Sequence, residues 1–349
     1  MATTKKVLST LSGHPLKHSQ TNKRKHHLPR HWQRLVLMFL TLLGLAGISA
    51  RASELKPGTV AAFEHYIAAT EARMENDVRL NQFLIVDRLP DSQRQEAYNQ
   101  LQRGEAYIEE LHTEEDLHPI HIPNGLVHHW TGVIFIPKAT LSETIAVLND
   151  YDHEPDIYKP EIRRSKLIEQ NGNQSKIYLQ FYNKSIVTVV LDAYFDVIET
   201  QIGNTRVQSA SRSTRIVEVA DVGSPNEHER TDGNDHGYMW RLCSYWRIEE
   251  KDDGVYIENE SITLTRTVPV MLAWLVGPLT KSIPRDVLMH TLTNTRKAVV
   301  NSGTASKQEN RSHGGSVLRE YFPIGAIASL NQFAKNLLAC PSLFQLYAE

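Results

Sequence analysis

Six segments with strand-like patterning follow one another between residues 163 and 266, and no helical pattern separates them. They are Arg163–Glu169, Ser175–Tyr182, Ser185–Ile198, Thr205–Ala220, Tyr238–Glu249 and Val255–Arg266. Turn-forming sequences such as Asn171–Asn173 and Asp252–Gly254 lie between neighbouring segments. Because connections this short cannot cross over to a parallel neighbour, these strands can only pair in an antiparallel sheet.

One strand and one helix are expected before these segments, and helices are expected after them. Val127–Ile136 is strand-like, and Thr140 is placed to cap a helix over Leu141–Asp150. After the last strand, Pro269–Leu279 is short and very apolar. A longer helix is expected over Pro284–Val300, because proline is favoured in a first helical turn.

The strand Tyr238–Glu249 shows what such a sheet has to cover. One face carries Trp240, Leu242, Ser244, Trp246 and Ile248, and the other carries Met239, Arg241, Cys243, Tyr245 and Arg247. A single terminal helix covers an apolar face only where the sheet curls around it, and such a sheet does not close completely. The sequence therefore predicts an α+β fold: a curved antiparallel β-sheet wrapped around a long C-terminal helix (a helix-grip), with a small helical N-terminal lead-in.

Residues 125–300 resemble the START-like (SRPBCC, helix-grip) superfamily, which includes lipid-transfer domains, pollen-allergen-like proteins and polyketide cyclases. The segments that carry the resemblance are Thr140–Pro160, Ser244–Pro269 and Trp274–Val300. The resemblance implies that sheet and long helix enclose a lipid or another apolar molecule. It implies no particular chemistry, because proteins of one fold differ in function.

The N-terminus has the organisation of a secretory signal. Residues 1–52 contain nine Lys or Arg residues and no Asp or Glu. The uncharged apolar run Leu35–Ile48 is 14 residues long and is followed by the small-x-small site Ala50–Ala52. We therefore expect export to the periplasm or the extracellular space, because a run this short is poorly suited to span a membrane. The alternative is anchoring in the membrane by an uncleaved signal.

The chain is expected to divide into four parts. A signal peptide (1–52) precedes a helical lead-in (53–124), whose helices are predicted at Thr59–Val78 and from Ser92 to about Leu111, with a brief strand-like run at Phe83–Val86. The START-like domain (125–301) follows, and 302–349 forms a linker and tail, because Ser302–Ser316 is polar and rich in Gly and Ser.

Composition excludes several classes of protein. Two Cys are too few for a disulfide scaffold or a Cys-based zinc module, although Cys243 and Cys340 could pair after export. Beyond residue 52 the chain carries 29 basic and 40 acidic residues, a net charge of −11, so nucleic acid is not an expected partner. Peripheral contact with a membrane and the oligomeric state remain open.

No motif predicts a catalytic residue, a cofactor or a metal. The chain lacks G-x-S-x-G, the P-loop, G-x-G-x-x-G after a strand, H-E-x-x-H and C-x-x-C. His118 and His121 have a spacing that could share a metal ion, but Pro119 and Pro123 break any helix that would align them. Asp150–Glu154 has residue types suited to acid–base chemistry, but helix termination explains it better.

The expected ligand site is the cavity between sheet and helix. Its predicted lining is Val189, Leu191, Arg212, Arg215, Trp240, Leu242, Trp246, Trp274, Leu288 and Leu292. Strand alternation places Ser211, Ser213 and Arg215 on one face and Arg212 and Thr214 on the other. Either arginine could hold a carboxylate or phosphate head group. The favoured alternative is that these arginines pair with Asp or Glu on the exterior of the sheet.

Three functions from different classes are compatible with these features. The leading hypothesis is an exported, non-catalytic protein that binds a lipid or another hydrophobic small molecule. The second is an enzyme on the same fold, a cyclase, dehydratase or hydrolase, which requires titratable groups that converge inside the cavity. The third is a structural envelope protein whose core is filled.

Overall fold

The computed structural model describes residues 55–184, 188–231, 235–267 and 270–312, with the backbone alone in 270–282 and 305–312. The helices are α2 (Pro57–Arg79), α3 (Asp91–Gln102), α4 (Leu141–Leu148), α5 (Glu154–Tyr158) and α6 (Val270–Ser312), with 3₁₀ turns η1 (Ile85–Arg88) and η2 (Tyr151–His153). The strands are β1 (Tyr107–Glu110), β2 (Glu114–Glu115), β3 (His118–Pro119), β4 (Gly125–Pro137), β5 (Ile162–Asn171), β6 (Gln174–Lys184), β7 (Thr188–Ile202), β8 (Arg206–Ala220), β9 (His228–Glu229), β10 (Arg241–Lys251) and β11 (Gly254–Arg266).

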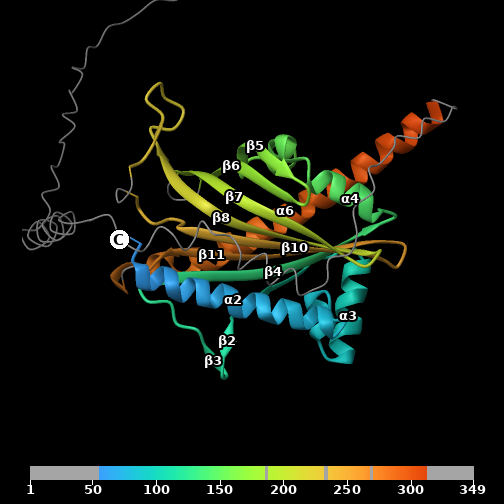
Figure 1. Cartoon of the computed structure of the whole chain (residues 1–349), viewed down its shortest axis with the longest axis horizontal. Coiled ribbons are helices and arrows are strands. Elements are labelled where there is room, and N and C mark those ends of the chain that lie inside the picture. The colour runs from blue at the N-terminus through green and yellow to red at the C-terminus, as the bar shows by residue number, and fades with distance from the viewer. Residues whose placement is uncertain (1–54, 185–187, 232–234, 268–269, 313–349) are drawn as a thin grey trace, which may run out of the picture. The chain divides into compact units, whose positions relative to one another are not determined.

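The main sheet has nine strands and is antiparallel throughout. Its order is β1-β4-β11-β10-β8-β7-β6-β5, with β9 paired to β8, while β2 and β3 form a separate hairpin. Helix α2 runs along one face of the twisted sheet, and α6 crosses the opposite face (Figure 1). This arrangement confirms the predicted α+β fold with a curved antiparallel sheet packed on a long C-terminal helix.

Local sequence signals account for several connections. The β10–β11 hairpin turns at Asp252 and Asp253, whose φ angles are 56° and 59°. Two consecutive positive φ angles suit the right-handed twist of the strands, and Asp tolerates them better than most residues. The predicted cap of α4 is also confirmed: the Thr140 hydroxyl accepts a hydrogen bond from the Glu143 N–H, and the Glu143 carboxylate accepts one from the Thr140 N–H.

The segment before β4 differs from its prediction. The second helix begins at Asp91 and ends at Gln102 rather than near Leu111, and Gly104 follows it with a φ of 88°. This left-handed residue ends the helix, and Tyr107–Glu110 then joins the sheet as the edge strand β1 beside β4. The run predicted as a strand at Phe83–Val86 instead leads into the turn η1, because its apolar side chains are buried without any strand partner.

The C-terminal helix is longer and less interrupted than predicted. The sequence indicates two helices, yet α6 is one continuous element of 43 residues over Val270–Ser312. Its last turns include the first part of the stretch predicted to be a linker, where Ala, Lys, Gln, Glu and Arg are good helix formers. The predicted signal, the rest of the tail with Cys340, and the side chain of Trp274 lie outside the described residues.

The two faces of the sheet bury separate apolar clusters. On the face toward α6, here called the inner face, Ile134, Ile248 and Ile257 pack with Leu288 and Leu292 of α6. A second inner cluster joins α5 to the strands β5–β7 through Tyr158, Ile162, Ile177, Leu179, Ala193, Phe195 and Val197. On the face toward α2, here called the outer face, the clustered residues include Phe63, Tyr66, Met74, Tyr245 and Ile262. The sheet is therefore covered on both sides.

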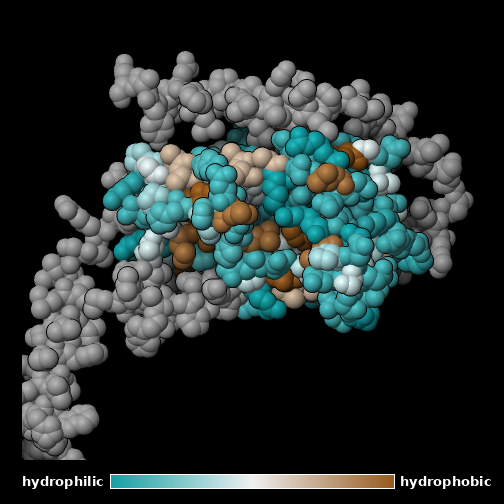
Figure 2. Space-filling model, turned by 90° about the horizontal axis from the view of Figure 1, so that it is seen from below, coloured by the Kyte–Doolittle hydropathy of each residue, from teal (hydrophilic) through white to brown (hydrophobic). Residues whose placement is uncertain are grey.

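The exterior on the α2 side is mostly hydrophilic. Seen from below Figure 1, hydrophobic areas are small and separated by hydrophilic side chains (Figure 2). Among the helices that the structure describes, none combines the length and the hydropathy needed to cross a membrane. Most of the large apolar side chains that the structure describes are instead buried in the core, and their burial provides the main driving force for folding.

Candidate functional site

The middle of the inner face is polar, and it lies between the two inner apolar clusters. Strand register brings six hydroxyl side chains together there, on β8, β10 and β11: Ser209, Ser211, Ser213, Ser244, Ser261 and Thr263. We call these residues the hydroxyl row. Ser244 lies opposite both Ser211 and Ser261, and residues directly opposite each other point to the same face.

Each member of the hydroxyl row is half-buried. Two of them have hydrogen-bond partners: Asn259 Nδ2 donates to Ser244 Oγ at 2.9 Å, and the Leu242 N–H donates to Ser213 Oγ at 3.0 Å. In the described part of the chain, no side-chain hydrogen bond engages the other four hydroxyls. A hydroxyl is both a donor and an acceptor, so these four groups can bind a polar group of a ligand.

Apolar side chains adjoin the hydroxyl row on the same face. Trp246 pairs directly with Ser209, and Leu242 lies two residues before Ser244 on β10, so strand alternation places it on the same face. Both side chains are half-buried, whereas the intervening Tyr245 on the outer face is almost fully buried. The inner face thus offers apolar and hydrogen-bonding surface side by side, a combination typical of small-molecule sites.

A carboxyl group with a shifted pKa lies at the start of α5. Glu154 is the first residue of α5, and burial raises the pKa of its carboxyl group to about 8. A carboxyl with that pKa is largely protonated at neutral pH and can donate a hydrogen bond. Nearby, the Tyr158 hydroxyl donates to Thr295 Oγ1 at 2.9 Å, which ties α5 to α6.

The later part of α6 packs tightly on the sheet. Leu288 and Leu292 lie against Gly132 of β4, and a Cβ on that glycine would stand 2.7 Å from Leu292 Cδ1. Because no side chain fits in that space, no ligand fits there either. Of the predicted lining, Leu288 and Leu292 are therefore core residues.

Two residues of the predicted lining, Arg212 and Trp240, lie on the outer face. Arg212 Nε and Nη2 bond the Glu71 carboxylate of α2 at 3.2 and 2.5 Å. Trp240 precedes β10 in a bend, so strand alternation does not apply to it, and it joins the outer cluster. These positions correct the sequence prediction.

A third residue of the predicted lining, Arg215, is displaced by a β-bulge. Register shifts between Tyr194 and Phe195, so that Phe195 pairs with Ser213 while Tyr194 pairs with Arg215. The extra residue, Thr214, separates Arg215 from the face of Ser211 and Ser213, because a bulge reverses the alternation that follows it. Arg215 is exposed and pairs with Glu229 at 2.6 Å, which agrees with the favoured exterior pairing.

Four other predicted lining residues lie on the inner face. Leu191 is buried opposite Phe181, and Val189, two residues earlier on β7, is half-buried. Leu242 and Trp246 adjoin the hydroxyl row, as described above. The hydroxyl row itself was not predicted, although the alternation of Ser209, Ser211 and Ser213 in the sequence was a signal for it.

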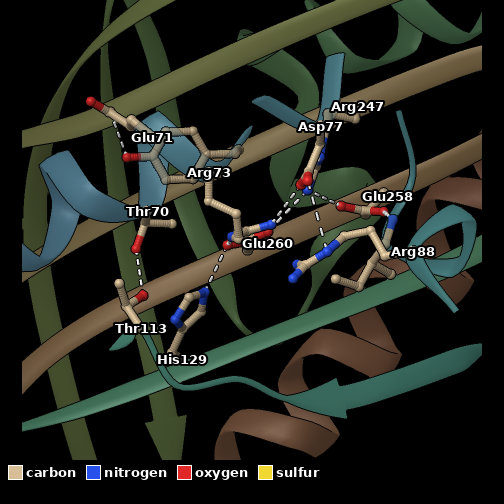
Figure 3. A network of polar contacts seen from close by, with 12 residues as sticks. Thr70, Glu71, Arg73, Asp77, Arg88, Thr113, His129, Arg247, Glu258 and Glu260 are labelled. Atoms are coloured by element: carbon tan, nitrogen blue, oxygen red, sulfur yellow. Dashed lines mark hydrogen bonds and ion pairs between the residues drawn. The ribbon is translucent and has the colours of Figure 1, made fainter. Parts of the chain in front are cut away.

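The outer face holds a buried network of charged side chains under α2 (Figure 3). Arg247 is fully buried, and its Nη2 lies 2.5 Å from Glu258 Oε1 and 3.0 Å from Glu260 Oε2. From α2, Arg73 reaches both Glu260 and Asp77. Since each buried charge has an opposite charge beside it, the network fastens α2 to the sheet.

A histidine extends this network through a chain of hydrogen bonds. His129 Nε2 lies 2.7 Å from Glu260 Oε1, and its Nδ1 lies 2.8 Å from the Tyr66 hydroxyl. The Thr113 N–H donates to the same hydroxyl at 2.9 Å. Burial lowers the pKa of His129, so its neutral form is favoured. A neutral His129 ring donates from Nε2 to Glu260 and accepts at Nδ1 from Tyr66, so each group in this series of hydrogen bonds has a partner.

The two glutamates of the network titrate in opposite directions. Burial raises the pKa of Glu258 to about 7, and Arg247 opposes this shift only in part. Burial would also raise the pKa of Glu260, but His129, Arg73 and Arg247 outweigh it and hold that pKa below its usual range. Glu260 is therefore the charge on which the cations converge. The centre of the network, formed by Arg247, Glu258 and Glu260, is buried, so we assign it a structural role.

The histidines between β3 and β4 form no cluster among the described residues. His118 is exposed in β3, while His128 and His129 point to opposite faces of β4, as expected from strand alternation. No group of three or more His, Cys, Asp or Glu side chains within the described residues is placed to hold a metal ion. Cys243 is buried in the outer cluster, where burial raises the pKa of its thiol to about 12.

No protein-family model matches this chain, and no curated protein matches it. Among solved structures it is similar to a STAR-related lipid transfer protein fragment from Xanthomonas axonopodis, with 14% identity over 54% of this chain and 98% of that chain and a TM-score of 0.36. Human STARD10 is similar at 11% identity over 65% and 86% of the two chains, with a TM-score of 0.37. The Zhui aromatase/cyclase from Streptomyces sp. R1128 is similar at 14% identity over 55% and 100%, with a TM-score of 0.31. Likenesses at this level do not indicate what this chain binds.

Proposed function

We propose that this protein binds a hydrophobic small molecule that carries hydrogen-bonding groups, between the inner face of the sheet and the first half of α6. The observation that carries the proposal is the hydroxyl row, which is half-buried beside Leu242 and Trp246. A sheet face that only fills a core is normally apolar, because burying a hydroxyl without a partner costs free energy. A ligand that pairs with these hydroxyls would remove that cost.

The resemblance found in the sequence supports a lipid-like ligand. Apolar surface would supply most of the affinity, at about 25 cal/mol for each Å² removed from water. The hydroxyls would select ligands with oxygen or nitrogen atoms along their length, since an unmatched polar group in the site is penalised. Catalysis has less support, because the two titratable residues in register with the hydroxyl row do not come together. Glu199 lies opposite Ser209 and bonds Asn149, whereas His128 lies opposite Thr263, at the other end of the row, and bonds Thr265.

Native mass spectrometry tests this proposal. The purified full chain is incubated with a total bacterial lipid extract, and we expect one bound small molecule per chain. The double variant Ser211→Leu/Ser244→Leu fills the hydroxyl row and should lose the bound molecule. Ser142→Leu, at an exposed position of α4, is the matched control and should retain it. The proposal fails if no adduct forms, or if the double variant binds as the parent does.

We further propose that residues 1–52 direct export of the chain. The basic segment, the apolar run Leu35–Ile48 and the small residues at Ala50 and Ala52 support this proposal. N-terminal sequencing of protein recovered from the periplasm or the medium should find a mature chain that begins near Ser53. Recovery of the whole chain from the cytoplasm would contradict export, and an intact N-terminus in the membrane fraction would indicate an anchor.

A further inference from the structure

A groove of about 490 Å³ lies where the end of α3, the end of β4 and the later part of α6 meet. Its apolar side chains are Leu101 and Phe135, which are buried, and Pro137 and Val300, which are exposed. This groove is on a different part of the fold from the hydroxyl row. Its volume is in the range of sites for small molecules.

Basic side chains line the α6 side of the groove. Arg296 Nη1 donates to the Gly104 carbonyl at 2.7 Å, which holds the guanidinium group at the edge of the groove. Lys297 is exposed on the next position of α6. Within the described residues, neither cation is paired with a carboxylate.

A third cation at the groove is already balanced. Arg103 pairs with Glu96 at 3.2 Å and with Glu105 at 3.4 Å, so its charge is compensated within α3 and the following turn. Among the described residues that line it, the groove therefore carries two uncompensated positive charges, from Arg296 and Lys297, beside an apolar wall. The rest of the chain after residue 52 is strongly acidic, which makes this local excess of positive charge distinctive.

We propose that this groove binds an anionic amphiphile, a molecule that carries a carboxylate or phosphate group on an apolar chain. Arg296 and Lys297 would hold the anionic group through charge-assisted hydrogen bonds. The exposed side chains of Pro137 and Val300 would contact the first part of the apolar chain. The occupant is thus defined by charge complementarity on one side of the groove and by apolar contact on the other.

Isothermal titration calorimetry with dodecyl phosphate, below its micelle concentration, tests the proposal on the full chain. We expect saturable binding that weakens at least about tenfold in Arg296→Gln/Lys297→Gln. The exposed Lys297→Gln alone should weaken it in the same direction without any effect on folding. Val300→Asp should also weaken binding, because it removes apolar surface and adds a negative charge.

Controls separate the groove from other sites. Arg164→Gln/Lys166→Gln removes the same two charge types from β5 and should bind dodecyl phosphate as the parent does. Ser211→Leu/Ser244→Leu should also leave the groove-dependent binding intact, so that the groove and the proposed inner-face site can fail independently. Inorganic phosphate should bind more weakly than dodecyl phosphate, since it lacks the apolar chain.

Several results would overturn the proposal. Dodecanol that binds as tightly as dodecyl phosphate, with equal sensitivity to the variants, would show that charge is irrelevant. Variant-dependent binding to phosphatidylglycerol vesicles without binding of the monomeric amphiphile would identify a membrane-docking surface instead. A dimer in sedimentation velocity that depends on Lys297 would show that a second copy of the chain occupies the groove. Binding of dodecyl phosphate that none of the groove variants changes would show that the groove is not its site.

Discussion

The two faces of the sheet differ in how their polar side chains find hydrogen-bond partners. On the outer face, polar groups are paired with one another: Arg247 with Glu258 and Glu260, and His129 with Tyr66 and Glu260. On the inner face, the hydroxyl row lies half-buried and, among the described residues, in part without protein partners. A face whose polar groups are mutually satisfied holds the fold together, and a face whose polar groups are available can hold a ligand.

The largest expected loss of stability comes from a substitution on the outer face. Arg247→Met should lower the free energy of unfolding by about 3–5 kcal/mol, because it leaves the carboxylates of Glu258 and Glu260 buried without their shared cation. Urea unfolding followed by circular dichroism measures this change. Arg164→Met, at the exposed pair with Glu227, should stay within about 1 kcal/mol of the parent. Equal losses in both variants would mean that the network is not a stabilising feature.

The pH dependence of stability should reveal Glu258. Its pKa in the folded state is about 7, above the usual value of 4.5, so the folded state binds more protons between those values. Its contribution to stability is therefore fully present below pH 4.5 and is lost as pH rises through 7. As pH rises through this window, the free energy of unfolding of Glu258→Gln should increase relative to that of the parent, by up to about 1.4 kcal/mol per pH unit.

Other groups of the network oppose this trend and have to be separated from it. Glu260 and His129 both have lowered pKa values, so the stability that they contribute is lost as pH falls, below 4.5 for Glu260 and below 6.5 for His129. Because Glu258 and Glu260 share Arg247, their contributions are not additive, so Glu258→Gln is compared with the parent above pH 6.5, where folded Glu260 stays charged and folded His129 stays neutral. A difference that does not change with pH would show that Glu258 has an ordinary pKa.

A smaller effect is expected from the hydrogen-bond chain. Tyr66→Phe should cost about 1–2 kcal/mol, because it removes the partner of His129 Nδ1 and the acceptor for the buried Thr113 N–H. Thermal unfolding of the variant provides the measurement. An unchanged midpoint would indicate that water replaces the hydroxyl and reaches His129 under α2.

The smallest effect is expected for the corresponding tyrosine on the inner side. Tyr158 donates to Thr295 Oγ1, while Thr295 itself donates to the Thr291 carbonyl at 2.8 Å. Tyr158→Phe thus leaves no donor unsatisfied and should cost about 1 kcal/mol or less in the same unfolding assay. A loss larger than that of Tyr66→Phe would reverse the proposed contrast between the two faces.

The sequence predicted the parts of the fold that depend on local pattern. Alternation and turn residues locate the long strands, the turn at Asp252 and Asp253, and the opposite faces of Leu242 and Cys243. These features follow from neighbouring residues alone. The same alternation failed at Arg215, because the bulge at Thr214 has no signature in the sequence, and at Trp240, which precedes the strand.

The outer network could not be predicted, because it depends on contacts between distant segments. Arg73 and Glu260 are 187 positions apart, and the sequence offers no measure of which face α2 covers. A partial signal existed: on one face of the last strand, Glu258 and Glu260 lie between Tyr256 and Ile262, and buried charges require partners. That signal indicates that partners exist without identifying the helix that supplies them.

The contrast between the two faces can be measured on neighbouring residues of one strand. Ser244→Cys places a thiol in the hydroxyl row, next to the native Cys243 of the outer cluster, and Cys340→Ser removes the other native thiol. With a small, uncharged methanethiosulfonate reagent, we expect the introduced thiol to be modified at least about tenfold faster than Cys243 in ligand-free protein, and we expect bound lipid to protect it. Equal rates, or modification of Cys243 alone, would contradict an accessible inner face.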